Sequence, residues 1–288
     1  MSVKVVVDST SYISEDIANR YDIKVVPLSV VFGDGEVYKE GTITNEEFYN
    51  KLGNASEIPK SSQPSVDGMY ETFEEIIKED NEIVGVFLSS EMSGTYSTAN
   101  MVKDMILKNY PDAKIELIDS RTNCMQLGFA AITAAKAAAE GETIQQTVEL
   151  VKQNMSRSRF VFTPETLEYL KKGGRIGAAQ ALLGSFLNIK PILTVNDGKT
   201  DVITKVRSKK KAVGKIVEIF MDDEKKFGFG DGIIHHINCE NEALELSNKI
   251  KEMIGKTLPI CPIGPVIGVH VGPGSIGIAY YTQKDMEK

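Results

Sequence analysis

Short runs of β-branched and aliphatic residues alternate, along the amino-terminal half, with longer stretches in which apolar residues recur every three or four positions. The short runs predict buried strands, and the longer stretches predict amphipathic helices. Because helix-length segments separate several of the strands, we predict a mostly parallel, doubly wound α/β sheet. The predicted strands are residues 3–7, 24–31, 82–88 and 114–118.

Capping signals mark where helices of this half begin. Thr44 and Glu47 form a capping box ahead of one apolar segment, and Ser65 precedes a second apolar segment. Residues 96–109 and the alanine-rich residues 124–140 also have helical periodicity. The small side chains of the alanine-rich helix predict that it packs closely.

The carboxy-terminal half has a different order of elements. Its last two predicted strands are joined only by residues 272–275. A parallel pair needs a crossover of about a dozen residues, so we predict that these strands are antiparallel and that this half is an α+β domain with a mixed or antiparallel sheet. The predicted strands are residues 160–162, 192–195, 202–206, 233–238, 266–271 and 276–281, and the predicted helices are residues 164–172, 209–226 and 241–254.

The chain length corresponds to two domains. At roughly 150 residues per domain, 288 residues are enough for two hydrophobic cores. We place the boundary near residue 155, which predicts an α/β domain over residues 1–155 and an α+β domain over residues 156–288.

Composition argues against several classes of function. Forty acidic against 33 basic residues give a formal charge of -7, which removes the electrostatic reason to expect nucleic-acid binding. No apolar stretch approaches the roughly 18 residues of a membrane-spanning helix, and the first apolar run reads as a strand, so we expect neither a membrane span nor a signal peptide. Three widely separated cysteines are typical of reduced thiols, which favours a cytoplasmic location.

Four segments rich in hydroxyl groups lie where predicted strands end or helices begin. In an open α/β sheet, ligands bind beyond the carboxyl ends of the strands, and helix amino termini favour an anionic oxygen. We therefore predict a small anion site, with plain helix capping by serine and threonine as the alternative interpretation of each segment. The four segments are residues 8–11, 61–65, 89–95 and 119–122.

The segment from Ser89 to Thr95 is the strongest of the four. A buried strand precedes it, and Gly94 allows the backbone to approach a ligand before a helix begins at Thr95 or Tyr96. Ser93 would then face the anion as a hydrogen-bond donor. A nucleophilic role for Ser93 has less support, because the G-x-S-x-G pattern of a nucleophile elbow is absent from the sequence.

The histidines and the glycine-rich turn do not predict a metal or dinucleotide site. Residues 272–277 fit G-x-G-x-x-G as a string, but a strand follows where the motif requires a helix. We interpret this segment as a tight turn that places His270 at the end of a strand. His235 and His236 are adjacent on a predicted strand and would point to opposite faces, which does not suit chelation of one metal.

Two basic segments stand out against the acidic chain. One crosses a strand-to-helix junction and contains Arg207, and the other, residues 171–176, contains Arg175 at a predicted helix end. Solvated helix surfaces and helix-dipole compensation explain both, and docking of an acidic partner or a phosphate is the alternative. The residues of the first segment are Lys205, Arg207, Lys209, Lys210, Lys211 and Lys215.

Five of these segments, taken in order, resemble the DegV family. The resemblance spans nearly the whole chain, and the co-occurrence of all five is more specific than any one of them. It departs from the family pattern at Ser61, where the family often has threonine, and at Tyr12, where the family usually has an acid. The segments are Asp8-Ser-Thr-Ser11, Lys60-Ser-Ser-Gln-Pro-Ser65, Leu88-Ser-Ser-Glu-Met-Ser-Gly-Thr-Tyr-Ser97, Leu167-Glu-Tyr-Leu-Lys-Lys-Gly-Gly-Arg-Ile-Gly177 and His270-Val-Gly-Pro-Gly274.

The resemblance implies the lipid-binding subunit (FakB type) of a bacterial fatty acid kinase. A long-chain fatty acid would lie between the two domains, with at most transient contact to a membrane surface. A separate subunit would bind ATP and Mg²⁺ and make acyl phosphate for phospholipid synthesis, so this chain would need no cofactor and would not be catalytic alone. Arg175 and Arg207 match family arginines implicated in partner docking. The implied carboxylate-binding positions are Ser61, Ser62, Ser93, Gly94, Thr95 and His270.

An acyl hydrolase is the alternative function. Ser93 would be the nucleophile and His270 the base, with Asp8 or Asp119 at a strand end as the orienting acid. A protein of this kind would turn over activated esters without a partner, whereas a binding subunit would not.

Overall fold

The computed structural model describes residues 2–184 and 189–286, and the chain divides into two compact units. The first unit consists of Met1–Ser29 and Ser62–Ser156, and the second of Val30–Ser61 and Arg157–Lys288. The second unit therefore includes a segment, Val30–Ser61, that the predicted boundary near residue 155 assigns to the amino-terminal domain.

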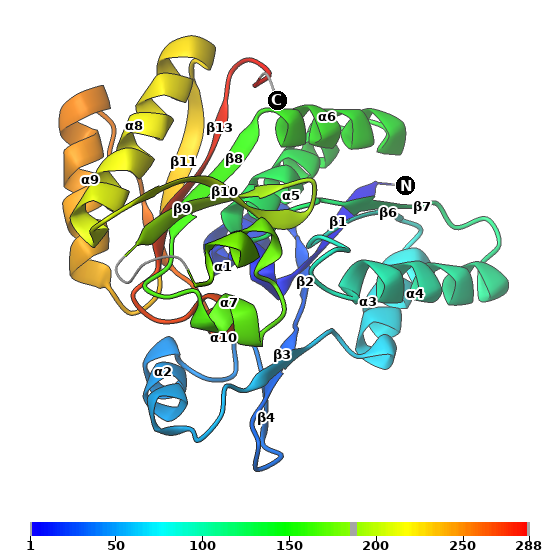
Figure 1. The fold of residues 1–288 in the computed structure, drawn as a ribbon. Helices are drawn as coiled ribbons and strands as arrows, with labels where there is room; N and C mark the ends of the chain where they lie inside the picture. The colour runs from blue at the N-terminus through cyan, green and yellow to red at the C-terminus, as the bar shows by residue number, and fades with distance from the viewer. Residues whose placement is uncertain (1, 185–188, 287–288) are drawn as a thin grey trace. The chain divides into compact units, whose positions relative to one another are not determined.

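A four-stranded parallel sheet forms the centre of the first unit (Figure 1). The strand order is β2-β1-β6-β7, and each neighbouring pair is parallel. The carboxyl ends of β1, β6 and β7 consequently meet at one edge, as the predicted α/β sheet requires. The strands are β1 (Val3–Asp8), β2 (Lys24–Val26), β6 (Glu82–Phe87) and β7 (Ile115–Asp119).

Helices cover both faces of this sheet. Val6 packs in one hydrophobic cluster with residues of α3 and α4, whereas α5 and α6 contact each other and the same strands. Successive strand residues point to opposite faces, and Val5, Val6 and Val7 are all buried, so both faces are covered. The doubly wound arrangement is confirmed. The helices are α1 (Glu15–Tyr21), α3 (Val66–Lys78), α4 (Thr95–Asn109), α5 (Cys124–Ala139) and α6 (Ile144–Ser156), with a 3₁₀ turn at Ser9–Ser11.

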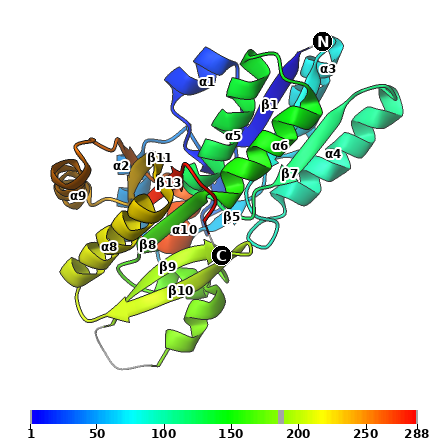
Figure 2. The ribbon, with the colours of Figure 1, turned by 90° about the horizontal axis from the view of Figure 1, so that it is seen from above.

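The second unit contains a six-stranded mixed sheet, as predicted. Its order is β10-β9-β8-β13-β11-β12, with antiparallel pairs except for the parallel pair β11 and β12. Helices α8 and α9 lie beside this sheet (Figure 2). Their apolar residues pack into one cluster with residues of β8, β9, β11 and β13. The strands are β8 (Ser158–Thr163), β9 (Lys190–Asn196), β10 (Lys199–Val206), β11 (Phe229–His236), β12 (Ile260–Pro262) and β13 (Ile276–Thr282). The helices are α7 (Glu168–Lys172), α8 (Lys209–Phe227), α9 (Glu240–Ile254) and α10 (Pro265–Val271), with a 3₁₀ segment at Gly177–Leu182.

The segment Val30–Ser61 joins the second unit through a small sheet and one helix. The sheet has the order β4-β3-β5, and the capping box of Thr44 and Glu47 begins α2 as predicted. The hydroxyl group of Tyr49, on α2, donates to the carbonyl oxygens of Ile263 (2.8 Å) and Gly264 (3.2 Å), just before α10. The elements are β3 (Ser29–Val31), β4 (Val37–Lys39), α2 (Asn45–Asn54) and β5 (Lys60–Ser62).

The predicted strand at residues 266–271 is wrong, because this segment is the helix α10. Pro265 occupies the first helical turn, where its missing N–H costs nothing, and Gly268 donates a helical hydrogen bond back to Gly264. The turn at residues 272–275 therefore joins a helix to β13, and the predicted antiparallel pair does not exist. His270 accordingly lies at the end of a helix, and β13 is antiparallel to β8 and β11 instead.

Other boundaries differ by smaller amounts. The predicted strand at residues 24–31 is two strands, β2 and β3, separated by Pro27 and Leu28. The predicted helix at residues 164–172 is shorter and begins at Glu168. Among the residues that the structure describes, no helix combines the length and the apolar character that crossing a membrane requires.

Candidate functional site

The hydroxyl-rich loops of the first unit meet at the carboxyl edge of its parallel sheet. Asp8, at the end of β1, accepts a hydrogen bond from the N–H of Leu88 at 2.7 Å. Ser89 donates its N–H to the carbonyl of Thr122 at 2.9 Å, which joins the loops after β6 and β7. Ser90 donates to the Asp119 carboxylate, so three loops form one hydrogen-bonded group.

The turn after β6 places Ser93 at the start of α4. Its N–H donates to the carbonyl of Ser89 at 3.1 Å, and its Oγ lies 2.9 Å from the Thr95 hydroxyl and accepts the Thr95 N–H at 3.3 Å. Helix α4 begins at Thr95, and the first N–H groups of a helix have no partner within it. The Ser93 hydroxyl therefore lies beside a helix amino terminus, where an anionic oxygen is favoured.

Gln63 holds the segment before α3 against this turn, a role that the sequence pattern does not predict. Its Nε2 donates to the Thr98 hydroxyl at 2.7 Å. A Cβ on Gly94 would lie 2.0 Å from the Gln63 Oε1, so glycine is what permits this approach. Gln63 lies within the hydroxyl-rich segment 61–65, which is the one signal in the sequence that points to it. Ser62 is exposed, and its hydroxyl makes a 3.4 Å contact with the Gln63 carbonyl.

The second unit brings two further predicted residues together. Ser61, on β5, lies 2.7 Å from the Nε2 of His270, on α10. Burial and the nearby positive charge of Arg175 lower the pKa of His270 from 6.5 to about 4, so its ring is neutral at pH 7. With its proton on Nε2, the ring donates to the Ser61 oxygen and leaves the Ser61 hydrogen free to bind an anion.

A close contact with Gly173 fixes the imidazole of His270. A Cβ at Gly173 would lie 2.3 Å from the His270 Nδ1, closer than real side chains approach. Nδ1 is buried and has no hydrogen-bond partner among the described residues. The ring is therefore held by packing on one side and by Ser61 on the other.

The two predicted docking arginines have different surroundings. Arg175 is half-buried, donates to the carbonyl of Gly173 at 2.6 Å and acts on the charge state of His270. Arg175 is therefore part of the surroundings of His270. Arg207 is exposed at the end of β10.

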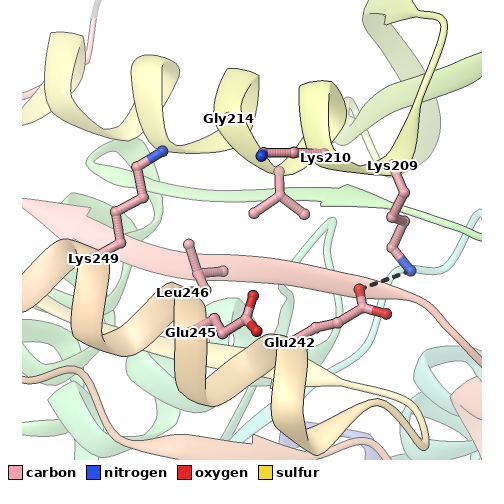
Figure 3. Close-up of a pocket in the computed structure, with 8 residues that line it drawn as sticks. Lys209, Lys210, Gly214, Glu242, Glu245, Leu246 and Lys249 are labelled. Carbon is pink, nitrogen blue, oxygen red and sulfur yellow. Dashed lines mark ion pairs between the residues drawn. The ribbon is translucent and has the colours of Figure 1, made fainter.

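The basic segment at the start of α8 lies beside acidic side chains of α9. Lys209 forms an ion pair with Glu242 at 3.1 Å (Figure 3). It also forms an ion pair with Glu165 at 3.3 Å, and its ammonium group binds the carbonyl of Gly274. A groove of about 420 Å³ runs between the two helices, lined by Lys209, Lys210, Val213, Gly214, Glu242, Glu245, Leu246 and Lys249. Lys209 thus connects α8 to the turn that follows His270.

The other two histidines are buried in the mixed sheet. His235 has its Nδ1 3.1 Å from the carbonyl of Cys261, and burial lowers its pKa to about 4. Burial also lowers the pKa of His236. Within residues 2–184 and 189–286, no three His, Cys, Asp or Glu side chains are grouped so that they could hold a metal ion.

The hydrogen bonds of the site do not support the hydrolase alternative. A hydrolase needs the serine hydroxyl bonded to a base that an acid orients in turn. The Ser93 hydroxyl bonds within its own turn, and the His270 Nε2 bonds to Ser61. Asp8 accepts from Thr10 and Leu88, and Asp119 accepts from Ser90 and Arg121.

Comparisons with known proteins cover the full length of the chain. Residues 2–283 match the model of the DegV family of uncharacterised proteins. A DegV domain-containing protein of Clostridium acetobutylicum is 53% identical over 286 residues, which cover 99% of this chain and 100% of that protein. The structure is similar to that of DegV from Bacillus subtilis, described as a fatty acid binding protein, with a TM-score of 0.88, 30% identity and coverage of 98% of this chain and 99% of that chain. It is also similar to a stearic acid-binding protein from Eubacterium ventriosum, with a TM-score of 0.89, 26% identity and coverage of 98% of both chains.

Proposed function

Because this chain belongs to the DegV family, we propose that it binds a long-chain fatty acid and presents the carboxylate to a separate ATP-dependent kinase subunit. The observation that carries the proposal is the hydrogen-bonded pair of Ser61 and His270, which forms an uncharged donor group. The chain that contains this pair is similar to solved fatty acid binding proteins. The Ser93 turn at the start of α4 supplies a second set of neutral donors.

The proposed carboxylate site consists of hydroxyl and backbone N–H groups. The donors would come from Ser61, Ser62 and His270 and from the turn formed by Ser93, Gly94 and Thr95. A neutral His270 adds no charge to the site, so the carboxylate would be oriented without a bidentate arginine clamp occupying both of its oxygens. One oxygen would remain able to attack the γ-phosphorus of ATP, giving acyl phosphate and ADP.

Affinity would come from the alkyl tail. At roughly 0.8 kcal/mol per buried methylene, a chain of about fifteen carbons offers on the order of 12 kcal/mol before the ordering costs of association. Neutral donors to a single carboxylate contribute much less, because each replaces a hydrogen bond to water. The proposal therefore requires a long apolar pocket for the tail.

Mass spectrometry of the purified protein tests the binding function. Native spectra should show the mass of the chain plus about one fatty acid, and denaturing spectra the mass of the chain alone. Organic extraction should release a long-chain fatty acid. A single apo mass in both spectra, together with failure of the protein to take up added palmitate, would contradict the proposal.

The kinase partnership is tested separately with the arginines. We expect Arg207→Ala and Arg175→Ala to retain bound fatty acid and to slow phosphorylation by the ATP-binding subunit. Lys256→Ala is a control for the loss of one positive charge, since Lys256 lies against the Phe229 ring, away from both arginines in the sequence. Loss of bound lipid in an arginine variant would move that residue from the docking surface to the lipid site.

A further inference from the structure

Asp8 is a completely buried carboxylate to which the proposed function assigns no role. Its Oδ1 accepts from the N–H (3.0 Å) and the hydroxyl (2.5 Å) of Thr10, and its Oδ2 accepts from the N–H of Leu88 at 2.7 Å. Among the described residues, no ion pair reaches it. Burying an ionisable group without a counter-charge is unfavourable, so its presence calls for an explanation.

The hydrogen bond to Leu88 connects Asp8 to the Ser93 turn. Leu88 precedes Ser89, which is fully buried and accepts hydrogen bonds through its carbonyl from the N–H groups of Met92 (3.0 Å) and Ser93 (3.1 Å). The Ser89 hydroxyl also accepts the N–H of Glu91 at 3.2 Å. The position of Ser89 therefore decides where the Ser93 hydroxyl lies, and Asp8 holds the residue next to it.

We propose that Asp8 is a positioning residue for the carboxylate site, which acts by anchoring the Leu88–Ser89 peptide from which the Ser93 turn extends. This inference rests on the proposed function, because it concerns binding of a fatty acid carboxylate at Ser93. Asp8 itself does not touch the ligand.

Only an ionised carboxylate can make all of these hydrogen bonds. The two oxygens of Asp8 accept three donors, whereas a protonated acid or an asparagine replaces one acceptor with a donor. Protonation or Asp8→Asn would therefore set two donors against each other beside Thr10 or Leu88. Burial raises the pKa of Asp8 to about 6, with the Thr10 and Leu88 hydrogen bonds opposing the rise, so the anchor titrates close to neutral pH.

Charged groups from the neighbouring loops have partners of their own. The other strand ends of this sheet carry Asp119, Arg121 and Glu91, and Arg121 lies 3.5 Å from Glu91 and 3.7 Å from Asp119. Cys124 begins α5, which packs on β1. The largest causes of the Asp8 pKa shift are burial and the hydrogen bonds to Thr10 and Leu88.

A double-mutant cycle tests the proposal, with palmitate affinity measured calorimetrically on delipidated protein. In the protein that keeps Ser93, we expect Asp8→Asn to weaken palmitate binding about tenfold, which corresponds to the loss of one charge-assisted hydrogen bond. In the Ser93→Ala background the same change should weaken binding less than twofold, since residues that act as a unit are not additive. Asp223→Asn removes a carboxylate that is buried in the second unit beside Tyr280 and Arg159, and should leave palmitate affinity unchanged.

The pH dependence of palmitate affinity distinguishes positioning from a purely structural role. A purely structural role of Asp8 would leave the ratio of wild-type to Asp8→Asn affinity independent of pH. The ratio of wild-type to Asp8→Asn affinity should fall from about tenfold at pH 7.5 toward one at pH 5, as Asp8 takes up its proton. Thr10→Val keeps the carboxylate but removes one donor that lowers its pKa, so the loss of palmitate affinity on acidification should begin at a higher pH in Thr10→Val than in wild type. This comparison does not need Asp8→Asn and keeps the test available if that variant does not fold.

The outcomes separate the inference from the proposed function. Wild-type protein that takes up no palmitate contradicts the proposed function. If wild-type protein binds palmitate, an Asp8→Asn effect that is absent, independent of pH or equally large in the Ser93→Ala background contradicts the positioning role alone.

Discussion

Gly173 has to be a glycine because His270 occupies the space where a side chain would begin. A Cβ at this position would lie 2.3 Å from the His270 Nδ1 and 3.0 Å from the carbonyl oxygen of Tyr169. The φ of Gly173 is -74°, so steric room rather than backbone conformation sets the requirement. This contact explains why the His270 ring, whose Nδ1 has no hydrogen-bond partner among the described residues, still keeps one orientation toward Ser61.

We predict that Gly173→Ala displaces the imidazole and breaks its 2.7 Å hydrogen bond to Ser61. Fatty acid affinity should fall about tenfold, the typical cost of one buried hydrogen bond, in a fluorescence or calorimetric titration. Gly214→Ala is the matched control, because a Cβ there meets nothing within 4 Å. It should raise helix stability slightly and leave affinity unchanged. Equal affinity in both variants would show that the orientation of His270 does not matter for binding.

Helix α10 depends on a partner that is distant in the sequence. The Tyr49 hydroxyl binds the carbonyl oxygens of Ile263 and Gly264 at the start of α10. A Cβ at Gly268 would lie 2.3 Å from the same hydroxyl, so helix and tyrosine are fitted to each other. The segment Val30–Ser61 thus helps to place the helix that carries His270.

Tyr49→Phe should lower the free energy of unfolding by about 1.5 kcal/mol, since it leaves the buried Ile263 carbonyl without its donor. Urea denaturation followed by circular dichroism measures the change. Tyr38→Phe is the control, because the Tyr38 hydroxyl binds the exposed carboxylate of Glu36, and its removal should have a much smaller effect. Unchanged stability in Tyr49→Phe would mean that this hydrogen bond does not hold α10.

Local signals in the sequence are sufficient where one short-range interaction determines an element. The capping box at Thr44 and the cap at Ser65 predict the starts of α2 and α3 correctly. They are insufficient for residues 266–271, where a β-branched run suggests a strand and the surrounding contacts stabilise a helix. The membership of Val30–Ser61 in the second unit also rests on contacts more than 200 residues apart, which no local pattern reveals.

The sequence predicts which residue types form the candidate site, but it predicts few of the hydrogen bonds that connect them. The hydroxyl-rich segments point to Ser61 and Ser93, because such residues collect at strand ends and helix starts. The family resemblance assigns Ser61 and His270 to one carboxylate site, but their hydrogen bond spans 209 residues, and no local sequence pattern predicts it. Gln63 and Asp8 act by holding other residues, and the sequence carries no periodic signal for such roles.

Buried titratable groups shape how the whole molecule responds to acid. Burial lowers the pKa of His235 and His270 from 6.5 to about 4, so below pH 6.5 the unfolded chain binds protons that the folded protein does not. Stability contributed by these histidines is present above pH 6.5 and is lost as pH falls toward 4. The raised pKa of Asp8 acts in the opposite direction, favouring the folded state as pH falls from about 6 toward 3.8.

We predict that the free energy of unfolding decreases on acidification from pH 6.5 to 4.5. His235→Asn should reduce this slope by about 1.4 kcal/mol per pH unit, the value for one proton. Asp8→Asn should make the slope steeper by a similar amount, because it removes the opposing group. Urea denaturation at several pH values measures both slopes, and parallel curves for wild type and His235→Asn would contradict the assignment.

The most direct test of the whole account observes the ligand carboxylate itself. Palmitate carrying ¹³C at the carboxyl carbon is bound to the delipidated protein and followed by NMR. We predict one carboxylate resonance distinct from that of free palmitate, unchanged in Arg207→Ala and shifted in each of Ser61→Ala, Ser93→Ala and His270→Ala. A bound resonance that is identical in wild type and in all three site variants would show that the fatty acid head lies elsewhere and would contradict the account.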